Sequence, residues 1–149
     1  MILWRISNHV SLAGDDGLRA SARWHTRGSR VVYCSETSAA ALLETLVHFE
    51  IELRDLPARY RLLKIEAPDD VGVERVLVDE LPTDWPDRPD LTRALGDRWL
   101  QNRSTAVLRV PSVLVPETFN VLLNPVHPDA MRIVVVHVTG HVIDPRLLK

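Results

Sequence analysis

The order of the strand and helix patterns along this chain most constrains its fold. Two segments have helical periodicity, but the β-rich runs do not alternate with them regularly. A regular alternation would predict a doubly wound parallel sheet, so the irregular order favours an α+β domain. The expected strands are residues 1–6, 31–34, 60–65, 107–110, 120–123 and 132–138, and the expected helices are residues 39–49 and 91–101.

Two further segments are expected to be loops. Residues 11–21 contain two glycines and two aspartates, and residues 79–90 contain three prolines. No internal repeat, low-complexity tract or linker divides the chain. We therefore expect residues 1–149 to form a single domain, long enough to bury about two thirds of its unfolded surface.

Composition limits the classes of function. A net charge of −2 gives no reason to expect direct binding of nucleic acid or of an anionic membrane. Cys34 is the only cysteine, which excludes an intrachain disulfide and a thiolate zinc site and suits a reducing compartment. The N-terminus lacks the apolar core of a signal peptide, and apolar runs such as residues 133–136 are too short to span a bilayer. We expect a cytoplasmic protein.

The expected helix at residues 39–49 carries a single charged residue, Glu44. Hydroxyl side chains within residues 35–38 can cap its start. At about 100° per residue, Glu44 falls outside the apolar arc of the helix, between Ala40 and His48. The small alanines near the carboxylate leave room for another molecule to approach it.

Two arginines, Arg23 and Arg27, precede the short strand that contains Tyr33. A guanidinium group binds phosphate through a bidentate fork, and a tyrosine ring can stack on a base or donate its hydroxyl. Together with the isolated carboxylate of Glu44, these groups suit a protein that holds a dinucleotide and cleaves it at its sugar. Taken singly, they have simpler interpretations: surface arginines, a half-buried strand tyrosine and an exposed helix glutamate.

A series of short motifs in a fixed order covers nearly the whole chain and closely resembles the RES domain. This family, named for its Arg, Glu and Ser residues, comprises bacterial toxins of toxin–antitoxin pairs that destroy NAD. The motifs are Trp4-Arg5, Arg23-Trp24-His25 with Gly28, Tyr33-Cys34-Ser35, Ala41-Leu42-Leu43-Glu44, Leu95-Gly96-Asp97 with Trp99, Val110-Pro111-Ser112, and the run from Asn120 to Pro128. One departure is His25, where the family usually has asparagine.

The resemblance implies a fold similar to that of the ADP-ribosyltransferases, a split pair of antiparallel sheets with surrounding helices and an NAD cleft. It also implies residue roles. Glu44 is the catalytic carboxylate, which stabilises the positive charge that grows on the ribose as neutral nicotinamide leaves. Arg23 grips the pyrophosphate, and Tyr33 stacks on the nicotinamide or donates its hydroxyl. Ser112 orients the ribose or a phosphate. It is not expected to be a hydrolase nucleophile, because no Gly-x-Ser-x-Gly motif surrounds it.

Three more residues are candidates for substrate binding, namely Arg5, Arg27 and Asn124. Asn124 precedes a proline and can equally be a turn residue. The sequence lacks a glycine-rich dinucleotide loop, so NAD is expected as a substrate and not as a bound hydride carrier. The histidines show no HExxH spacing, so neither a metal nor another cofactor is expected.

Three functions remain open at this stage. The first is an enzyme that splits the nicotinamide–ribose bond with water or inorganic phosphate as acceptor. The second is a mono-ADP-ribosyltransferase that modifies a protein, although Glu36 is not an obvious second carboxylate for that reaction. The third is a non-catalytic module that only binds a DNA-binding antitoxin. The resemblance implies a cognate Xre-like antitoxin as partner, and a homodimer within the toxin–antitoxin complex is compatible with it.

Overall fold

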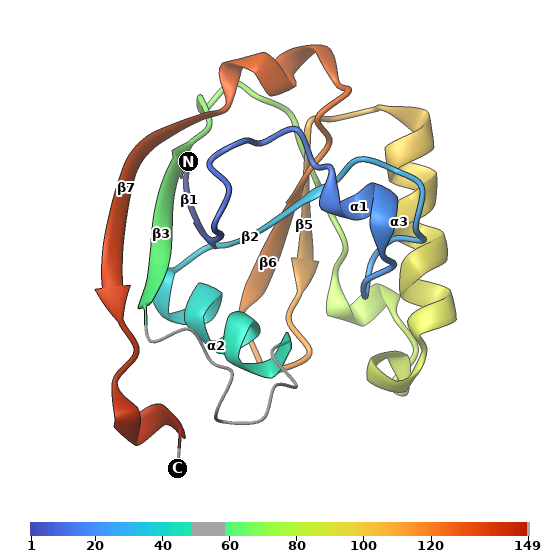
Figure 1. Cartoon of the computed structure of the whole chain (residues 1–149). Helices are drawn as coiled ribbons and strands as arrows, with labels where there is room; N and C mark the ends of the chain where they lie inside the picture. The colour runs from blue at the N-terminus through green and yellow to red at the C-terminus, as the bar shows by residue number, and fades with distance from the viewer. Residues whose placement is uncertain (49–58, 149) are drawn as a thin grey trace.

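Seven strands form one mixed sheet in the order β4-β5-β6-β2-β1-β3-β7 in the computed structural model, which describes residues 1–48 and 59–148 (Figure 1). The strands are β1 (Ile2–Ile6), β2 (Val32–Ser35), β3 (Arg59–Glu66), β4 (Val73–Arg75), β5 (Val107–Pro111), β6 (Phe119–Leu123) and β7 (Val134–Val142). The helices are α1 (Asp16–Arg19), α2 (Ser38–His48) and α3 (Pro89–Asn102), with 3-10 turns η1 (Val78–Glu80), η2 (Trp85–Asp87), η3 (Pro128–Arg132) and η4 (Pro145–Leu148).

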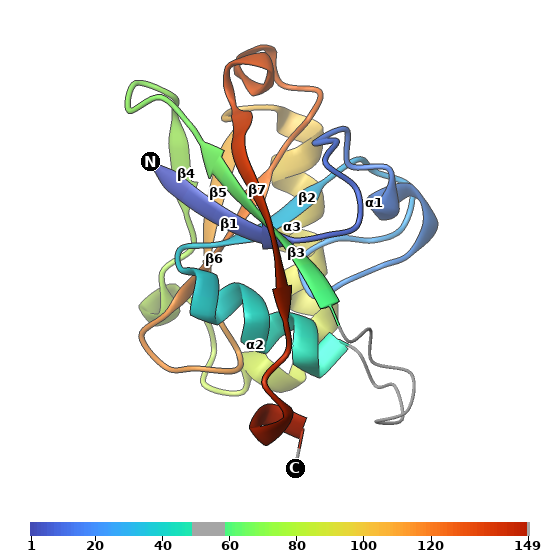
Figure 2. The same ribbon diagram turned by 60° about the vertical axis from the view of Figure 1, so that its left-hand side comes forward.

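The sheet is split into two halves between β1 and β2. These two strands are paired at a single position, Trp4 opposite Ser35, whereas β1 and β3 are paired along five positions. The strands β1, β3 and β7 run at an angle to β2, β5 and β6 (Figures 1 and 2). Five of the six strand pairs among the described residues are antiparallel, and β4 with β5 is the parallel one. The α+β class and the split sheet are confirmed.

Alternate residues of β5 and β6 face two different hydrophobic clusters. Val107, Val121 and Leu123 belong to one cluster, shared with β1, β2 and β3. Leu108 and Leu122, which lie opposite each other in the register, belong to the second cluster under α3. The period of two along a strand therefore buries both faces of this part of the sheet. Three tryptophans complete the second cluster: Trp24, Trp85 and Trp99.

Helix α2 begins where the sequence predicts it. The Thr37 hydroxyl accepts a hydrogen bond from the Ala40 amide (3.0 Å), which satisfies one of the free N–H groups at the helix start. Ala41 is the buried residue on the face that contacts β1 and β2. The helix is described as far as His48, and the predicted end at Phe49 lies outside the described residues.

Both predicted loops contain short regular elements. The four residues of α1 lie within residues 11–21, η2 lies within residues 79–90, and η1 overlaps the start of that second loop. The prediction of irregular structure is therefore wrong for these turns, because each is too short to show an apolar period. The three-residue strand β4 was missed for the same reason, and it is defined by parallel pairing with β5. No helix in the described part is long and apolar enough to cross a membrane.

Helix α3 touches the backbone of residues 22–26 at Gly96. A Cβ atom at this position would lie 1.6 Å from the Trp24 carbonyl oxygen, so only glycine permits the contact. Side chains of the same helix bind the segment on either side. They are Thr92, whose hydroxyl donates to the Arg23 carbonyl (2.5 Å), Arg93, whose Nε donates to the Ala22 carbonyl (2.8 Å), and Asp97, which accepts from the Thr26 amide (2.8 Å).

Substitution of Gly96 by alanine should destabilise the domain by about 2–3 kcal/mol, because α3 must move away from Trp24. In an unconstrained helix the same change would stabilise by roughly 1 kcal/mol, so the expected sign is opposite to helix propensity. Urea denaturation measures the difference. Gly140→Ala, with no atom within 4 Å of its added Cβ, is the control and should stay within about 0.5 kcal/mol. A Gly96→Ala protein as stable as the control would contradict the contact.

Candidate active site

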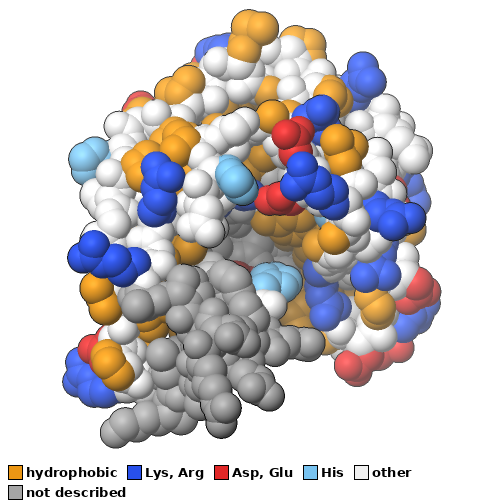
Figure 3. Space-filling view, in the orientation of Figure 1, with side chains coloured by type: hydrophobic (Ala, Val, Ile, Leu, Met, Phe, Trp, Pro, Cys, Tyr) orange, Lys and Arg blue, Asp and Glu red, His pale blue; other side chains and the backbone are white. Residues whose placement is uncertain are grey.

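A pocket of about 490 Å³ opens where the two halves of the sheet separate. Its walls come from β1, β2, α2, residues 16–25 and the β5–β6 connection, and its size suits a small-molecule site. The space-filling view shows a hollow with hydrophobic side chains inside it and positively charged side chains along one side (Figure 3). Four predicted site residues line this pocket together: Arg5, Arg23, Tyr33 and Glu44.

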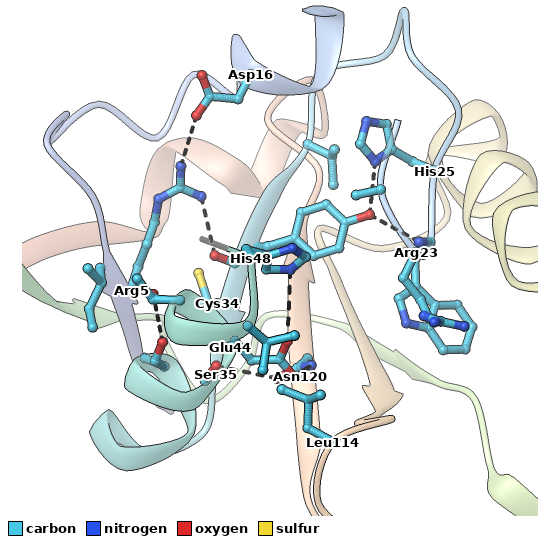
Figure 4. A pocket seen from close by; sticks show the side chains of 18 of the residues that line it. Arg5, Asp16, Arg23, His25, Cys34, Ser35, Glu44, His48, Leu114 and Asn120 are labelled. Carbon is cyan, nitrogen blue, oxygen red and sulfur yellow. Dashed lines mark hydrogen bonds and ion pairs between the residues drawn. The ribbon is translucent and has the colours of Figure 1, made fainter. Parts of the chain in front are cut away.

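Glu44 projects from α2 into the pocket with one carboxylate oxygen held in place (Figure 4). Its Oε1 accepts hydrogen bonds from Asn120 Nδ2 (2.7 Å) and from the Ser112 hydroxyl (3.2 Å). Its Oε2 lies 3.9 Å from Nε2 of His48, one turn further along the helix. The side chain is 24% exposed, so the carboxylate is accessible from the pocket.

Three hydrogen bonds, two from backbone amides and one from a side chain, determine which way the donors to Glu44 point. The Ser112 oxygen accepts from the amides of Leu114 (3.1 Å) and Val115 (3.4 Å), which leaves its proton for Glu44. The Ser35 hydroxyl donates to Oδ1 of Asn120 (3.3 Å), and this orients the amide nitrogen of Asn120 toward the carboxylate. Ser112 therefore positions Glu44 and does not itself line the pocket.

Tyr33 lies on β2, and its hydroxyl group has two protein partners. The Trp24 amide donates to the hydroxyl oxygen (3.2 Å), and Nδ1 of His25 lies 2.8 Å from it. Burial is the main reason why the pKa of Tyr33 is raised well above that of a free phenol. His25 is 2% exposed, so the histidine that departs from the family's asparagine is an internal residue of the pocket wall.

The two arginines of the pocket are held by backbone carbonyls. Arg23 Nη1 donates to the Pro86 carbonyl (2.7 Å) in η2. Arg5 Nη1 donates across the split in the sheet to the Tyr33 carbonyl (3.2 Å), and Nη2 lies 3.4 Å from a carboxylate oxygen of Asp16. The Arg5 side chain is only 16% exposed, and its buried Nε has no hydrogen-bond partner among the described residues.

Besides Ser112, three residues considered in the sequence lie outside the pocket lining: Arg27, Asn124 and Glu36. Arg27 is exposed. Asn124 is 0% exposed, donates to the Leu100 carbonyl (3.3 Å) and accepts from the Val126 amide (3.2 Å), so the turn role is the one observed. Glu36 is ion-paired with Arg109, so it does not share the hydrogen-bond partners of Glu44.

Asn120 and His48 are the site residues that sequence reasoning left without a role. Asn120 is a polar residue in an apolar strand, and that is the available signal, because such a side chain needs a partner when half-buried. His48 lies four residues after Glu44, the spacing at which helical side chains meet. Cys34 also lines the pocket, but burial raises its pKa to about 12, so it is a thiol and not a thiolate nucleophile.

No group of three or more His, Cys, Asp or Glu side chains in residues 1–48 and 59–148 is arranged to hold a metal ion. The four predicted site residues instead supply the pocket with an anchored carboxylate, two guanidinium groups and a phenol ring. This combination suits a substrate that has phosphate groups, a planar base and a site where positive charge develops.

The split sheet and its pocket define an α+β domain of the ADP-ribosyltransferase-like type. Residues 2–146 match the RES domain, and the chain belongs to the RES-domain toxin family. It is 48% identical over 130 residues to the protein named Toxin Res of Pseudomonas putida, with 87% of this chain and 88% of that protein covered. It is 36% identical to the Prs ADP-ribosylating toxin of Sphingobium sp., with 98% and 96% covered.

A solved structure has the same fold. A chain in the crystal structure of the M. tuberculosis MbcT–MbcA toxin–antitoxin complex superposes with a TM-score of 0.74 at 16% sequence identity. The superposition covers 98% of this chain and 85% of that chain. At this identity the likeness establishes the fold.

The burial of Tyr33 should make the free energy of unfolding depend on pH in the alkaline range. Because its pKa is higher in the folded than in the unfolded protein, the unfolded state loses the phenolic proton first, and the free energy of unfolding falls as the pH rises above about 10. Tyr33→Phe removes this contribution, so the difference in unfolding free energy between wild type and variant should shrink steadily above that pH. Urea denaturation at pH 8 to 11 measures it, and a constant difference would contradict the burial of the phenol.

Proposed function

We propose that this protein is a toxin that consumes NAD by breaking the bond between nicotinamide and ribose. The observation that carries the proposal is the anchored carboxylate of Glu44 in one pocket with Arg5, Arg23 and Tyr33. The relatives named Toxin Res and Prs ADP-ribosylating toxin support it. The alternative of a module that only binds an antitoxin would not require these four side chains to meet.

The reaction needs a negative charge beside the ribose. Nicotinamide is cationic in NAD and leaves as a neutral molecule, so it needs no general acid, while positive charge grows on the sugar. A carboxylate already in place stabilises that charge without reorganising. Asn120 and Ser112 hold Oε1 of Glu44, and Oε2 is available to accept a ribose hydroxyl.

The other pocket residues would hold the rest of the dinucleotide. The Tyr33 ring offers a flat surface for the nicotinamide. Arg23 has its guanidinium oriented by the Pro86 carbonyl, and Arg5 lines the same pocket. Both are suited to the pyrophosphate, because guanidinium groups stay charged and bind phosphate oxygens in pairs.

Water, inorganic phosphate or a protein side chain would accept the ADP-ribosyl group. The name of the Sphingobium relative favours the protein acceptor as a second candidate function. The observation against it is Glu36, the nearest upstream carboxylate, which pairs with Arg109 and does not line the pocket. We therefore place hydrolysis or phosphorolysis of NAD first.

An enzyme that drains NAD harms its own cell, so we also propose a cognate antitoxin that covers the pocket. The net charge of −2 leaves DNA binding to the partner, which we expect to be Xre-like. A carboxylate of the antitoxin could pair with Arg23 in place of a phosphate. The shared fold with a chain of a toxin–antitoxin complex agrees with this proposal.

Substitution of Glu44 by glutamine should lower kcat for NAD breakdown by roughly 10²–10³, because the group acts mainly on the transition state. The protein should stay folded, since the amide can still accept from Asn120. Release of nicotinamide by the purified variant measures the loss, and growth arrest with loss of cellular NAD should vanish on induction. A folded Glu44→Gln enzyme with wild-type kcat would remove Glu44 from the mechanism.

The products decide between the acceptors. Free ADP-ribose indicates water, a phosphorylated ADP-ribose that requires added phosphate indicates phosphorolysis, and labelled protein indicates transfer. Glu36→Gln is the matched control, because this carboxylate lies outside the pocket lining. It should keep NAD consumption within a few-fold, whereas dependence on both carboxylates would favour the transferase.

Saturation with a non-cleavable NAD analogue should weaken antitoxin binding, and the antitoxin should weaken analogue binding by the same factor, because linkage is reciprocal. The reason is the shared pocket around Arg23, Tyr33 and Glu44. Isothermal titration of the antitoxin with and without analogue measures both factors. If both affinities are unchanged, the antitoxin does not cover the pocket and must inhibit the protein from a distant surface.

A further inference from the structure

We propose that His25 is a positioning residue that holds the Tyr33 ring against the substrate and keeps the phenolic proton away from it. The proposal rests on the proposed reaction with NAD for its functional part. Its structural part concerns the order of protons around Tyr33, which can be measured without any substrate. The side chains involved line the pocket beside Glu44 (Figure 4).

Two backbone groups with fixed hydrogen-bonding roles bracket the pair. Nε2 of His25 lies 3.2 Å from the Gly17 carbonyl oxygen, which can only accept a hydrogen bond. The Tyr33 hydroxyl oxygen lies 3.2 Å from the Trp24 amide, which can only donate. Between them, Nδ1 of His25 and the Tyr33 oxygen are 2.8 Å apart.

These fixed roles determine the positions of both protons. His25 must carry its proton on Nε2 to donate to Gly17, so Nδ1 of the neutral ring is an acceptor. The Tyr33 oxygen already accepts from Trp24, so its own proton goes to Nδ1. Both ring nitrogens of His25 and the phenolic proton of Tyr33 then have a partner, as expected for a histidine that is only 2% exposed.

Gly17 is a fixed anchor for this arrangement. A Cβ at Gly17 would lie 2.3 Å from the Ser29 carbonyl oxygen, so the backbone here is closely packed. The Gly17 carbonyl also accepts from the Gly28 amide (3.0 Å), which holds its orientation. His25 therefore connects a rigid point near α1 to the tip of the Tyr33 side chain.

The same wall is closed on its other side by Arg5. Its guanidinium donates to the Tyr33 carbonyl and pairs with Asp16, the residue before Gly17. Tyr33 is thus held at its backbone through Arg5 and at its hydroxyl through His25, and both connections end at α1. Because the phenolic proton is committed to His25, Tyr33 meets the nicotinamide with its ring and does not act as a proton donor.

Two substitutions of His25 test the hydrogen bonds of its two ring nitrogens independently. In His25→Asn the amide oxygen lies near the position of Nδ1, so it still accepts from Tyr33 but does not reach Gly17. In His25→Gln the amide nitrogen lies near the position of Nε2, so it reaches Gly17 while Tyr33 loses its acceptor. His9→Gln, at an exposed histidine outside the pocket lining, is the matched control.

We expect His25→Gln to raise KM for NAD by about three- to tenfold, as for the loss of one hydrogen bond, with kcat within about twofold of wild type. His25→Asn should raise KM by less than His25→Gln does, because it keeps the hydrogen bond to Tyr33 and loses only the anchor at Gly17. Tyr33→Phe should match His25→Gln, and the double variant should be no worse than either, because both changes remove the same hydrogen bond. A fall in kcat of about a hundredfold in Tyr33→Phe alone would overturn the proposal, since it would make the hydroxyl a participant in the chemistry.

Nitrogen-15 NMR of the wild-type imidazole groups, assigned with the His25→Asn and His9→Gln proteins, tests the proton order directly. The expected His25 signal at pH 7 is that of a neutral ring with its proton on Nε2. A ring protonated on Nδ1, or on both nitrogens, would overturn the proposal whether or not the variants fold. If the wild-type protein leaves NAD intact, the proposed function fails, and this spectrum still decides the structural part.

Discussion

The contact between Gly96 and the Trp24 carbonyl sets the position of one wall of the pocket. It brings the backbone of α3 against residues 22–26, and the side chains of Thr92, Arg93 and Asp97 hold that segment along its length. This short segment supplies Arg23 and His25 and the amide that binds the Tyr33 hydroxyl. A helix that contributes no residue to the pocket lining thus determines where several lining residues lie.

The split in the sheet is the second constraint. A sheet that stays paired along its length offers no space between adjacent strands, whereas β1 and β2 meet at one position only. The opening exposes side chains of both strands and of α2 to the same volume. Arg5 bridges the gap by donating to the Tyr33 carbonyl, so a charged side chain replaces the missing ladder hydrogen bonds at this point. Arg5 therefore both lines the pocket and connects the two strands that form its walls.

Much of this could be predicted from the sequence. Strong local patterns identified α2, α3 and six of the strands to within a few residues, since apolar periodicity reports directly on buried faces. Short elements such as α1 and β4 could not be found, because four and three residues are too few to show an apolar period, and β4 is defined only by its pairing with β5. The motifs selected Arg5, Arg23, Tyr33 and Glu44, which do meet in one pocket.

The roles of two asparagines could be assigned only from the three-dimensional structure. Asn120 contacts Glu44 only because β6 lies beside β2, which places it opposite Ser35 in the register. Asn124 has the same side chain but turns into the interior, where backbone groups satisfy it. Local sequence cannot separate two asparagines of one motif when the difference lies in which strand runs alongside.

The way Ser112 holds Glu44 links the geometry of a loop to the energetics of the pocket. The serine oxygen is fixed by the amides of Leu114 and Val115, so the orientation of the carboxylate depends on the path of the chain after β5. In water, the dipoles around a carboxylate must rearrange whenever a positive charge appears nearby, and that rearrangement costs free energy at each turnover. Here the surrounding dipoles are set when the chain folds. Under the proposed function, insertion of one residue into this loop would leave every pocket side chain in the sequence and still add that reorganisation cost to the reaction.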